Sequence, residues 1–241
     1  MRRSYLARFM RAFCLKYGCI SMTEEDGELI PASTRTETAL DVAAFVGSAV
    51  PWIGGPVSSV LGGMSLGRKL GRVREVLEGL SDDLVDLQSD VSENYVKTEE
   101  FEDILEQALR RVGEERSEEK RQLYRAFLSD AIASPGEPYD DQLRMLRTFE
   151  ALAPDHLHVL KAIMQEPNPN PGSMGSPNQT LRERLPDFNE SRIEELINHL
   201  NDMRVTNLGS LKVMMTGHGA QDLRHVITGY GQRIINYINE A

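Results

Sequence analysis

Cysteine is nearly absent from this chain of 241 residues. The two that occur, Cys14 and Cys19, lie near the amino terminus, away from the segments whose apolar patterns predict a core. A disulfide scaffold or a cysteine-ligated zinc site needs more thiols, distributed through the fold. The sequence therefore argues against both and favours a reducing, cytoplasmic compartment.

An excess of positive charge is also lacking, because 27 Lys and Arg residues stand against 37 Asp and Glu residues. Proteins that coat nucleic acid replace condensed counterions with Lys and Arg side chains. The formal net charge of −10 argues against that class. With 40% apolar and 27% charged residues, the composition is that of an ordinary folded protein.

Catalytic and cofactor-binding patterns are missing as well. The chain has no Gly-x-Ser-x-Gly string and no arrangement of Cys and His that indicates a nucleophile. The glycine-rich string Thr216-Gly-His-Gly219 lacks the spacing and the Lys-Ser/Thr of a phosphate loop. His156 and His158 would lie on different faces of a helix, which predicts capping or surface histidines. We predict no enzymatic activity, no cofactor and no metal.

Residues 1–22 form a basic amphipathic stretch without an acidic residue. Its charges interrupt the apolar run that a secretory signal needs, which disfavours export. Two interpretations remain: a helix that lies on a membrane surface, or an untranslated stretch before a true start at Met22. Residues 24–38 are polar and carry Gly, Pro, Ser and Thr, so we predict a tail and flexible linker over 1–38.

Residues 42–67 contain no ionisable side chain and are long enough to span a bilayer. Two prolines flank Gly54-Gly55, so two short helices with a sharp turn fit better than one straight helix. A glycine-rich hairpin buried in the bundle is the favoured interpretation, because serines dilute the hydrophobicity. The alternative is membrane association, and a triggered release from the bundle onto the bilayer would reconcile the two. The residues assigned to membrane or self-association are Phe45, Pro51, Trp52, Gly54, Gly55, Gly63 and Gly67.

A heptad pattern dominates the next segment. Apolar residues recur at alternating spacings of four and three from Leu66 to Val91, which predicts a long helix with a continuous apolar seam. The favoured interpretation packs this seam against helices of its own chain, and the alternative is a coiled coil that supports a homo-oligomer. The seam consists of Leu70, Val73, Leu77, Leu80, Leu84, Leu87 and Val91.

Two cap signals predict the helices that follow. Thr98 and Ser117 each precede two glutamates, which combines an N-cap side chain with acids in the first helical turn. A further helix is predicted from Tyr139 to Leu152. Together with the seam helix, these would form a helical bundle in a domain at 39–152.

Residues 153–241 predict a helix-turn-helix module. A first helix opens at Pro154, a loop follows over 166–178, a short helix is expected over 180–185, and Asn189 caps the third helix. Two β-favouring runs, 204–208 and 211–215, are joined by Gly209-Ser210 and predict a tight hairpin.

This order resembles a winged helix, and Val226-Ile-Thr-Gly-Tyr-Gly231 is similar to the strand, threonine, glycine and helix ending frequent in that superfamily. The hairpin would be its wing. The expected fold is therefore mainly α, with an N-terminal helical bundle and a C-terminal winged helix. The layout of the whole chain, with Ala108-Leu-Arg-Arg111 and Ser117-Glu-Glu-Lys-Arg121, is similar to bacterial abortive-infection-alpha-type proteins. That resemblance implies a phage-defence or stress setting and supplies no catalytic residue.

A winged helix suggests DNA binding, with one helix in the major groove. Residues 189–204 carry two bases and four acids, the opposite of the balance expected for a groove reader. We therefore predict a non-enzymatic interaction or effector protein, cytoplasmic with conditional association with the inner membrane, whose winged helix docks a protein partner. The alternative is a DNA-binding transcription regulator. Its contact residues would be Arg192, Asn198, His199, Arg204 and Lys212.

The membrane hypothesis for residues 42–67 predicts that the purified full-length protein sediments with anionic liposomes, or releases a trapped dye, once it is triggered. The expected cause is burial of the uncharged segment in the bilayer. Cosedimentation and dye leakage measure both effects. If the protein does neither under any trigger, while deletion of 42–67 merely unfolds it, the segment belongs to the bundle.

Overall fold

The computed structural model describes residues 57, 67–86, 93–134, 136–170 and 172–240, and these are mainly helical, as predicted. Among them, no helix has both the length and the apolar character needed to cross a membrane. The tail, the linker and the predicted sites Phe45, Pro51, Trp52, Gly54, Gly55 and Gly63 lie outside the described residues.

The first group of elements comprises α4 (Gly67–Asp86), α5 (Glu93–Val96), α6 (Glu99–Glu114), α7 (Glu118–Ala133) and α8 (Tyr139–Ala151). The second group comprises α9 (Pro154–Met164), β1 (Met174–Gly175), α10 (Pro177–Arg184), α11 (Glu190–Asp202), β2 (Met215–Thr216), α12 (Gly217–Gln221), the 3-10 turn η1 (Arg224–Val226) and α13 (Gly229–Glu240). The described residues all belong to one compact unit, residues 35–241.

Side-chain caps begin α6 and α7 at the predicted residues. The Thr98 hydroxyl accepts a hydrogen bond from the Phe101 N–H at 3.2 Å, and the Ser117 hydroxyl accepts one from the Lys120 N–H at 3.3 Å. Each cap satisfies a backbone donor that the first helical turn leaves free. The predicted starts of these two helices are confirmed.

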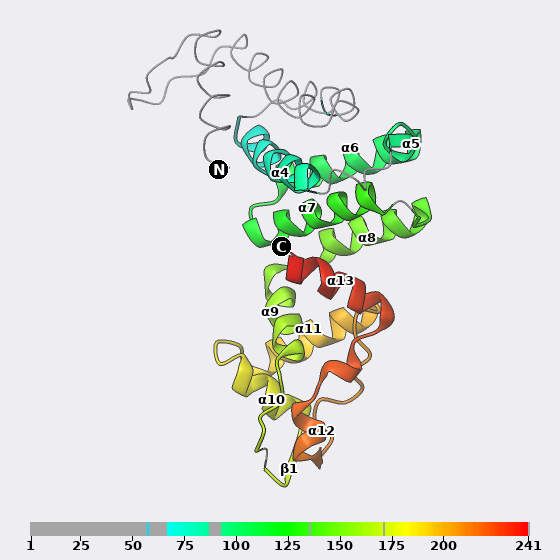
Figure 1. Cartoon of the computed structure of the whole chain (residues 1–241). Coiled ribbons are helices and arrows are strands. Elements are labelled where there is room, and N and C mark those ends of the chain that lie inside the picture. The colour runs from blue at the N-terminus through cyan, green and yellow to red at the C-terminus, as the bar shows by residue number, and fades with distance from the viewer. Residues whose placement is uncertain (1–56, 58–66, 87–92, 135, 171, 241) are drawn as a thin grey trace, which may run out of the picture. The chain divides into compact units, whose positions relative to one another are not determined.

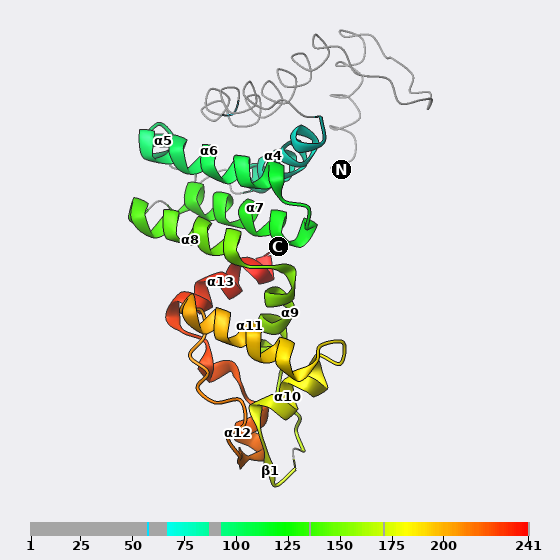
Figure 2. The same cartoon turned by 180° about the vertical axis from the view of Figure 1, so that it is seen from behind.

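The heptad seam packs inside its own chain. Helix α4 contacts α6 and α7, and the described seam residues Leu70, Val73, Leu77, Leu80 and Leu84 are all buried. Figures 1 and 2 show α4 and α6 on one side of α7 and α8, with α13 on the other side. Residues 70–84 therefore follow the favoured interpretation, whereas Leu87 and Val91 lie outside the described residues. Gly67 begins α4 and is exposed.

An aromatic cluster joins α13 to α7 and α8. The ring of Tyr237 in α13 meets Phe127 of α7 and Phe149 of α8 edge to face, with centroids 6.0 and 5.8 Å apart. Tyr124 of α7 meets Phe149 in the same way at 5.7 Å. The Tyr237 hydroxyl donates to an Asp130 carboxylate oxygen at 2.8 Å, so the polar end of this buried residue is also satisfied.

The C-terminal helices follow the predicted order with one shifted boundary. Pro154 lies at the start of α9, and the Asn189 side chain caps α11 by accepting from the Arg192 N–H at 2.8 Å. Helix α10 begins at Pro177, ahead of the predicted residue 180. The earlier start is explained by Ser176, which caps the Gln179 N–H at 3.3 Å, and by a proline in the first turn.

The predicted tight hairpin between 204–208 and 211–215 is wrong. Thr206 instead forms an isolated antiparallel bridge with Ile227, and β2 pairs with β1, with Met174 opposite Thr216. The Asn201 side chain explains the difference. Its amide nitrogen donates to Leu208 O at 2.8 Å and its oxygen accepts from Leu208 N at 3.0 Å, so both backbone groups of Leu208 are bonded to α11 and not to a hairpin partner.

Residues 205–207 pair with 226–228 at the end of α11. The Asn207 N–H donates to Val226 O at 2.7 Å, and the Thr228 N–H donates to Val205 O at 3.1 Å. The Thr228 hydroxyl in turn caps α13 by accepting from the Gly231 N–H at 2.9 Å. A Cβ added to Gly231 would lie 2.0 Å from Val205 O, so only glycine permits this approach of the two backbones.

We expect Gly231→Ala to lower the free energy of unfolding by more than about 2 kcal/mol, because the new methyl group forces the paired backbones apart. Gly229→Ala is the matched control, since a Cβ there meets nothing within 4 Å. Its effect should stay within about 0.5 kcal/mol or be stabilising. Urea denaturation of the two variants measures the difference. Equal stability of both would show that 205–207 and 226–228 do not approach each other as described.

Candidate functional site

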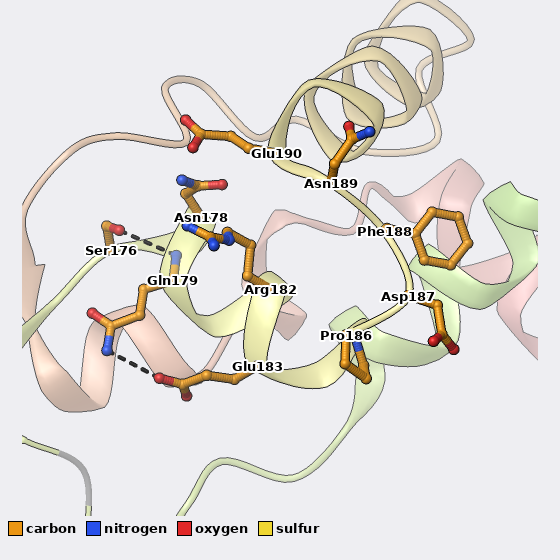
Figure 3. Close-up of a pocket in the computed structure, with 10 residues that line it drawn as sticks. All are labelled: Ser176, Asn178, Gln179, Arg182, Glu183, Pro186, Asp187, Phe188, Asn189 and Glu190. Atoms are coloured by element: carbon orange, nitrogen blue, oxygen red, sulfur yellow. Dashed lines mark hydrogen bonds between the residues drawn. The ribbon is translucent and has the colours of Figure 1, made fainter.

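An open cleft of about 770 Å³ lies between α10, the α10–α11 turn and the start of α11. Figure 3 shows Asn178, Arg182 and Glu183 on the α10 side, Asp187 and Phe188 on the turn, and Glu190 at the start of α11. The lining is mostly polar. We call this feature the α10–α11 cleft.

Acidic groups outnumber basic ones in the α10–α11 cleft. Its charged lining residues are Glu183, Asp187 and Glu190 against Arg182. The Lys212 ammonium lies 3.1 Å from a Glu190 carboxylate oxygen and 3.9 Å from one of Glu194. The hydrogen bond from Lys212 lowers the pKa of Glu190, so that this carboxylate stays ionised.

Asn178 contributes an unusual group to the cleft wall. Its backbone N–H donates to Leu211 O at 3.0 Å, which holds the 209–212 loop against the start of α10. Its side-chain oxygen is buried and has no hydrogen-bond donor among the residues that the structure describes. Buried acceptors of this kind normally find a partner.

Two cations expected to contact DNA are neutralised within the chain. The Arg192 guanidinium lies 2.6 Å from an Asp155 carboxylate oxygen and 2.8 Å from one of Glu195. The hydrogen bonds that Arg192 donates to both carboxylates raise the pKa of its guanidinium. Lys212 is held by Glu190. Ion pairs of this kind leave little net positive field for an approaching phosphate.

The remaining expected contact residues do not form one cationic face. Asn198 and His199 are exposed on the last turns of α11. Arg204 lies beyond the end of α11 with a φ of 60°, in the left-handed region. Its N–H donates to Asn201 O at 2.8 Å while the Val205 N–H donates to Leu200 O at 2.9 Å, the bonding pattern of a Schellman helix end.

Three of the other six Lys and Arg residues of 154–241 are neutralised in the same way. Lys161 pairs with Glu119, Arg224 with Glu166 and Asp222, and Arg233 with Glu137. Arg184 donates instead to the backbone oxygens of Ala162 and Gln221, each at 2.7 Å. Arg182 and Arg204 have no ion pair within 4.0 Å in the described part of the chain, although Arg182 acts electrostatically on Glu190.

A histidine pair was not anticipated from the sequence. His156 is buried, and its Nδ1 accepts from the Ala153 N–H at 2.9 Å, so it caps α9 as a predicted capping histidine. Because Nδ1 is an acceptor, Nε2 carries the proton of the neutral ring and donates to His199 Nδ1 at 2.9 Å. No lone pair of neutral His156 is then left for a metal ion. In the described residues, no group of three or more His, Cys, Asp or Glu side chains gathers as a metal site.

Three large apolar side chains are exposed to solvent near the α10–α11 cleft. Met174 is 57% exposed, Val213 49% and Met214 61%. They lie on β1 and on the residues that lead into β2. Figure 1 shows β1 beside α12, at the end of the C-terminal helices away from α13. We call these three residues the apolar tip.

Comparisons of the chain with protein-family models, with curated proteins and with solved structures found no match. Function is therefore inferred from the arrangement of this chain's own residues.

The His156 pair predicts a pH-dependent stability. Burial lowers the pKa of His156, and the charge of His199 lowers it further. The unfolded chain, in which a histidine has its ordinary pKa of about 6.5, then binds more protons than the folded chain as the pH falls. The free energy of unfolding should therefore fall as the pH drops from about 6.5 through the lower pKa of the folded state.

Substitution His156→Gln should reduce this pH dependence, because glutamine can still accept the Ala153 N–H but does not titrate. His158→Gln, at an exposed position of the same helix, is the control and should leave the dependence intact. Urea unfolding at a series of pH values provides the measurement. Parallel loss of stability in the wild type and His156→Gln would contradict the assignment.

Proposed function

We propose that residues 153–241 form a winged helix. The order of α9, β1, α10 and α11 supports this, as does the pairing of 205–207 with 226–228 before α13. In this interpretation the wing is the whole connection over 208–225, which carries β2, α12 and η1, rather than the short hairpin expected from the sequence. Thr228, which caps the last helix, stands where the resemblance has a threonine between the last strand and that helix.

We further propose that the protein is a non-enzymatic interaction protein whose winged helix docks a protein partner. The observation that carries this proposal is the neutralisation of Arg192 and Lys212 by acids of the same chain. A phosphate backbone would have to displace these acids before it gained the cations. The exposed acids Glu194, Glu195 and Asp202 on α11 would also repel it.

The wider setting of this function is part of the same proposal. The bacterial defence or stress role rests on the resemblance in layout, and the conditional membrane association rests on segment 42–67. Because seam residues 70–84 are buried within the chain, they are not available for a coiled coil with a second copy. We therefore assign the proposed self-association to segment 42–67. There, Gly63 and Gly67 have the spacing of a helix-dimerisation motif.

A DNA-binding regulator is the second candidate function. Asn198 and His199 are exposed side by side on α11, and Arg204 is exposed just beyond it. Asparagine and arginine are residue types that pair with base edges in the major groove. These residues favour the alternative, whereas the acidic residues around them on α11 oppose it because they repel DNA phosphates.

The docking proposal predicts that the full-length protein does not bind labelled duplex DNA, even at low salt, because α11 and the wing present more acid than base. Fluorescence anisotropy measures this. A variant that combines Asp155→Asn with Glu190→Gln, Glu194→Gln and Glu195→Gln removes the carboxylates paired with Arg192 and Lys212, and we expect it to gain weak, salt-sensitive binding. Sequence-specific binding by the wild type that Arg192→Glu weakens, and that Arg147→Glu on α8 leaves unchanged, would instead establish the DNA regulator.

A further inference from the structure

The apolar tip exposes large apolar side chains beside the α10–α11 cleft. In the described part of the chain, the large apolar side chains that stand out into solvent are Met174 on β1 and Val213 and Met214, the two residues that precede β2. Isolated exposed apolar residues are common, whereas gathered ones mark contact surfaces. Methionine also adapts its shape to a partner, because its side chain is unbranched and flexible.

The pairing of β1 with β2 brings the members of the apolar tip together. Met174 lies opposite Thr216, and Gly175 lies opposite Met215. Val213 and Met214 immediately precede β2, so this pairing brings the segment that carries them beside the segment that carries Met174. Long side chains on neighbouring strands can reach across such a pair.

The apolar tip adjoins the α10–α11 cleft. Ser176, in the cleft wall, follows β1 directly, and Leu211 is held against Asn178 by a backbone hydrogen bond of 3.0 Å. Lys212, which immediately precedes Val213, forms an ion pair with Glu190. A segment that covers the apolar tip and continues into the cleft therefore meets the carboxylates of Glu183 and Asp187, with Arg182 as the opposing charge, whereas Glu190 is already paired with Lys212.

We propose that the apolar tip and the α10–α11 cleft together bind a basic amphipathic segment of a partner protein. This inference rests on the docking function proposed above and adds the chemistry of the partner. Apolar side chains of the segment cover Met174, Val213 and Met214, and its Lys or Arg side chains face the cleft carboxylates. Apolar burial contributes most of the affinity, whereas charge complementarity sets the orientation and the association rate.

The surroundings of the cleft select against other partners. Phosphates of nucleic acid and anionic lipid headgroups carry the same sign of charge as Glu183 and Asp187, so they are repelled where a basic segment is attracted. The buried Asn178 side-chain oxygen lacks a donor in the described residues, and Lys and Arg side chains carry donors of the kind that it accepts.

The test is a titration of the full-length protein into a fluorescein-labelled amphipathic Lys/Leu peptide, followed by fluorescence anisotropy. The matching Glu/Leu peptide is the charge control. We expect the wild type to bind the basic peptide and not the acidic one. The double variant Met174→Ser with Met214→Ser should weaken binding about tenfold at any salt concentration, since it removes apolar contact area.

A second double variant, Glu183→Lys with Asp187→Lys, should also weaken binding about tenfold, and this effect should shrink as salt is added. Its matched control is Asp140→Lys with Asp141→Lys at the exposed start of α8, which makes the same change in net charge. We expect the control to bind like the wild type. All of the substituted positions are exposed, and circular dichroism verifies that each variant is folded.

Several outcomes would overturn the proposal. These are a wild type that does not bind the basic peptide, a control variant as weak as the cleft variant, or a Met174 and Met214 variant as tight as the wild type. Binding of the apolar tip to anionic liposomes or to the acidic peptide would assign the surface to another class of partner. If the basic peptide does not bind and the protein does not bind DNA either, only the proposed chemistry of the partner is rejected. Specific DNA binding would reject the docking function itself.

Discussion

The packing of Tyr237 against Phe127 and Phe149 connects the last helix to the helices that precede the C-terminal module. Three edge-to-face contacts bury large rings from α7, α8 and α13, which are far apart in the sequence. Around them, Tyr237 bonds Asp130 and Arg233 bonds Glu137 at 2.5 Å, so the polar rim of the contact is paired. Helix α13 therefore packs against α7 and α8, and the residues that precede it pair with 205–207.

The position of α13 depends in turn on the end of α11. Arg204 takes the left-handed conformation that lets the chain reverse, and Val205 then meets Thr228 and Gly231. Thr228 bonds both ways, with its hydroxyl donating to Arg204 O at 2.6 Å and accepting from the Gly231 N–H at 2.9 Å. One short contact region thus sets where α11 stops, where α13 starts and how far the 208–225 connection projects.

Charge pairing reduces the net positive charge that α11 and the 208–225 connection present to solvent. Cations on α11 and the 208–225 connection bond to acids from neighbouring elements, as Arg192 does with Asp155 of α9 and Lys212 with Glu190 of α11. Exposed ion pairs such as these add little to stability. Their effect on binding is larger, because they remove the positive field that a phosphate ligand needs and leave an acidic cleft beside an apolar tip.

Local signals in the sequence determined most of the helical framework. The caps at Thr98, Ser117 and Asn189 and the apolar spacing of the seam were sufficient to place their helices, because these features act within one or two turns. The acidic character of α11 also followed from composition. Long-range partners decided the rest. The predicted tight hairpin was wrong because the Asn201 side chain bonds the backbone of Leu208. The His156–His199 pair joins segments about forty residues apart in the sequence. The same separation divides Met174 from Val213 and Met214. Such pairings depend on how helices and loops pack in space, which no local pattern of residues specifies.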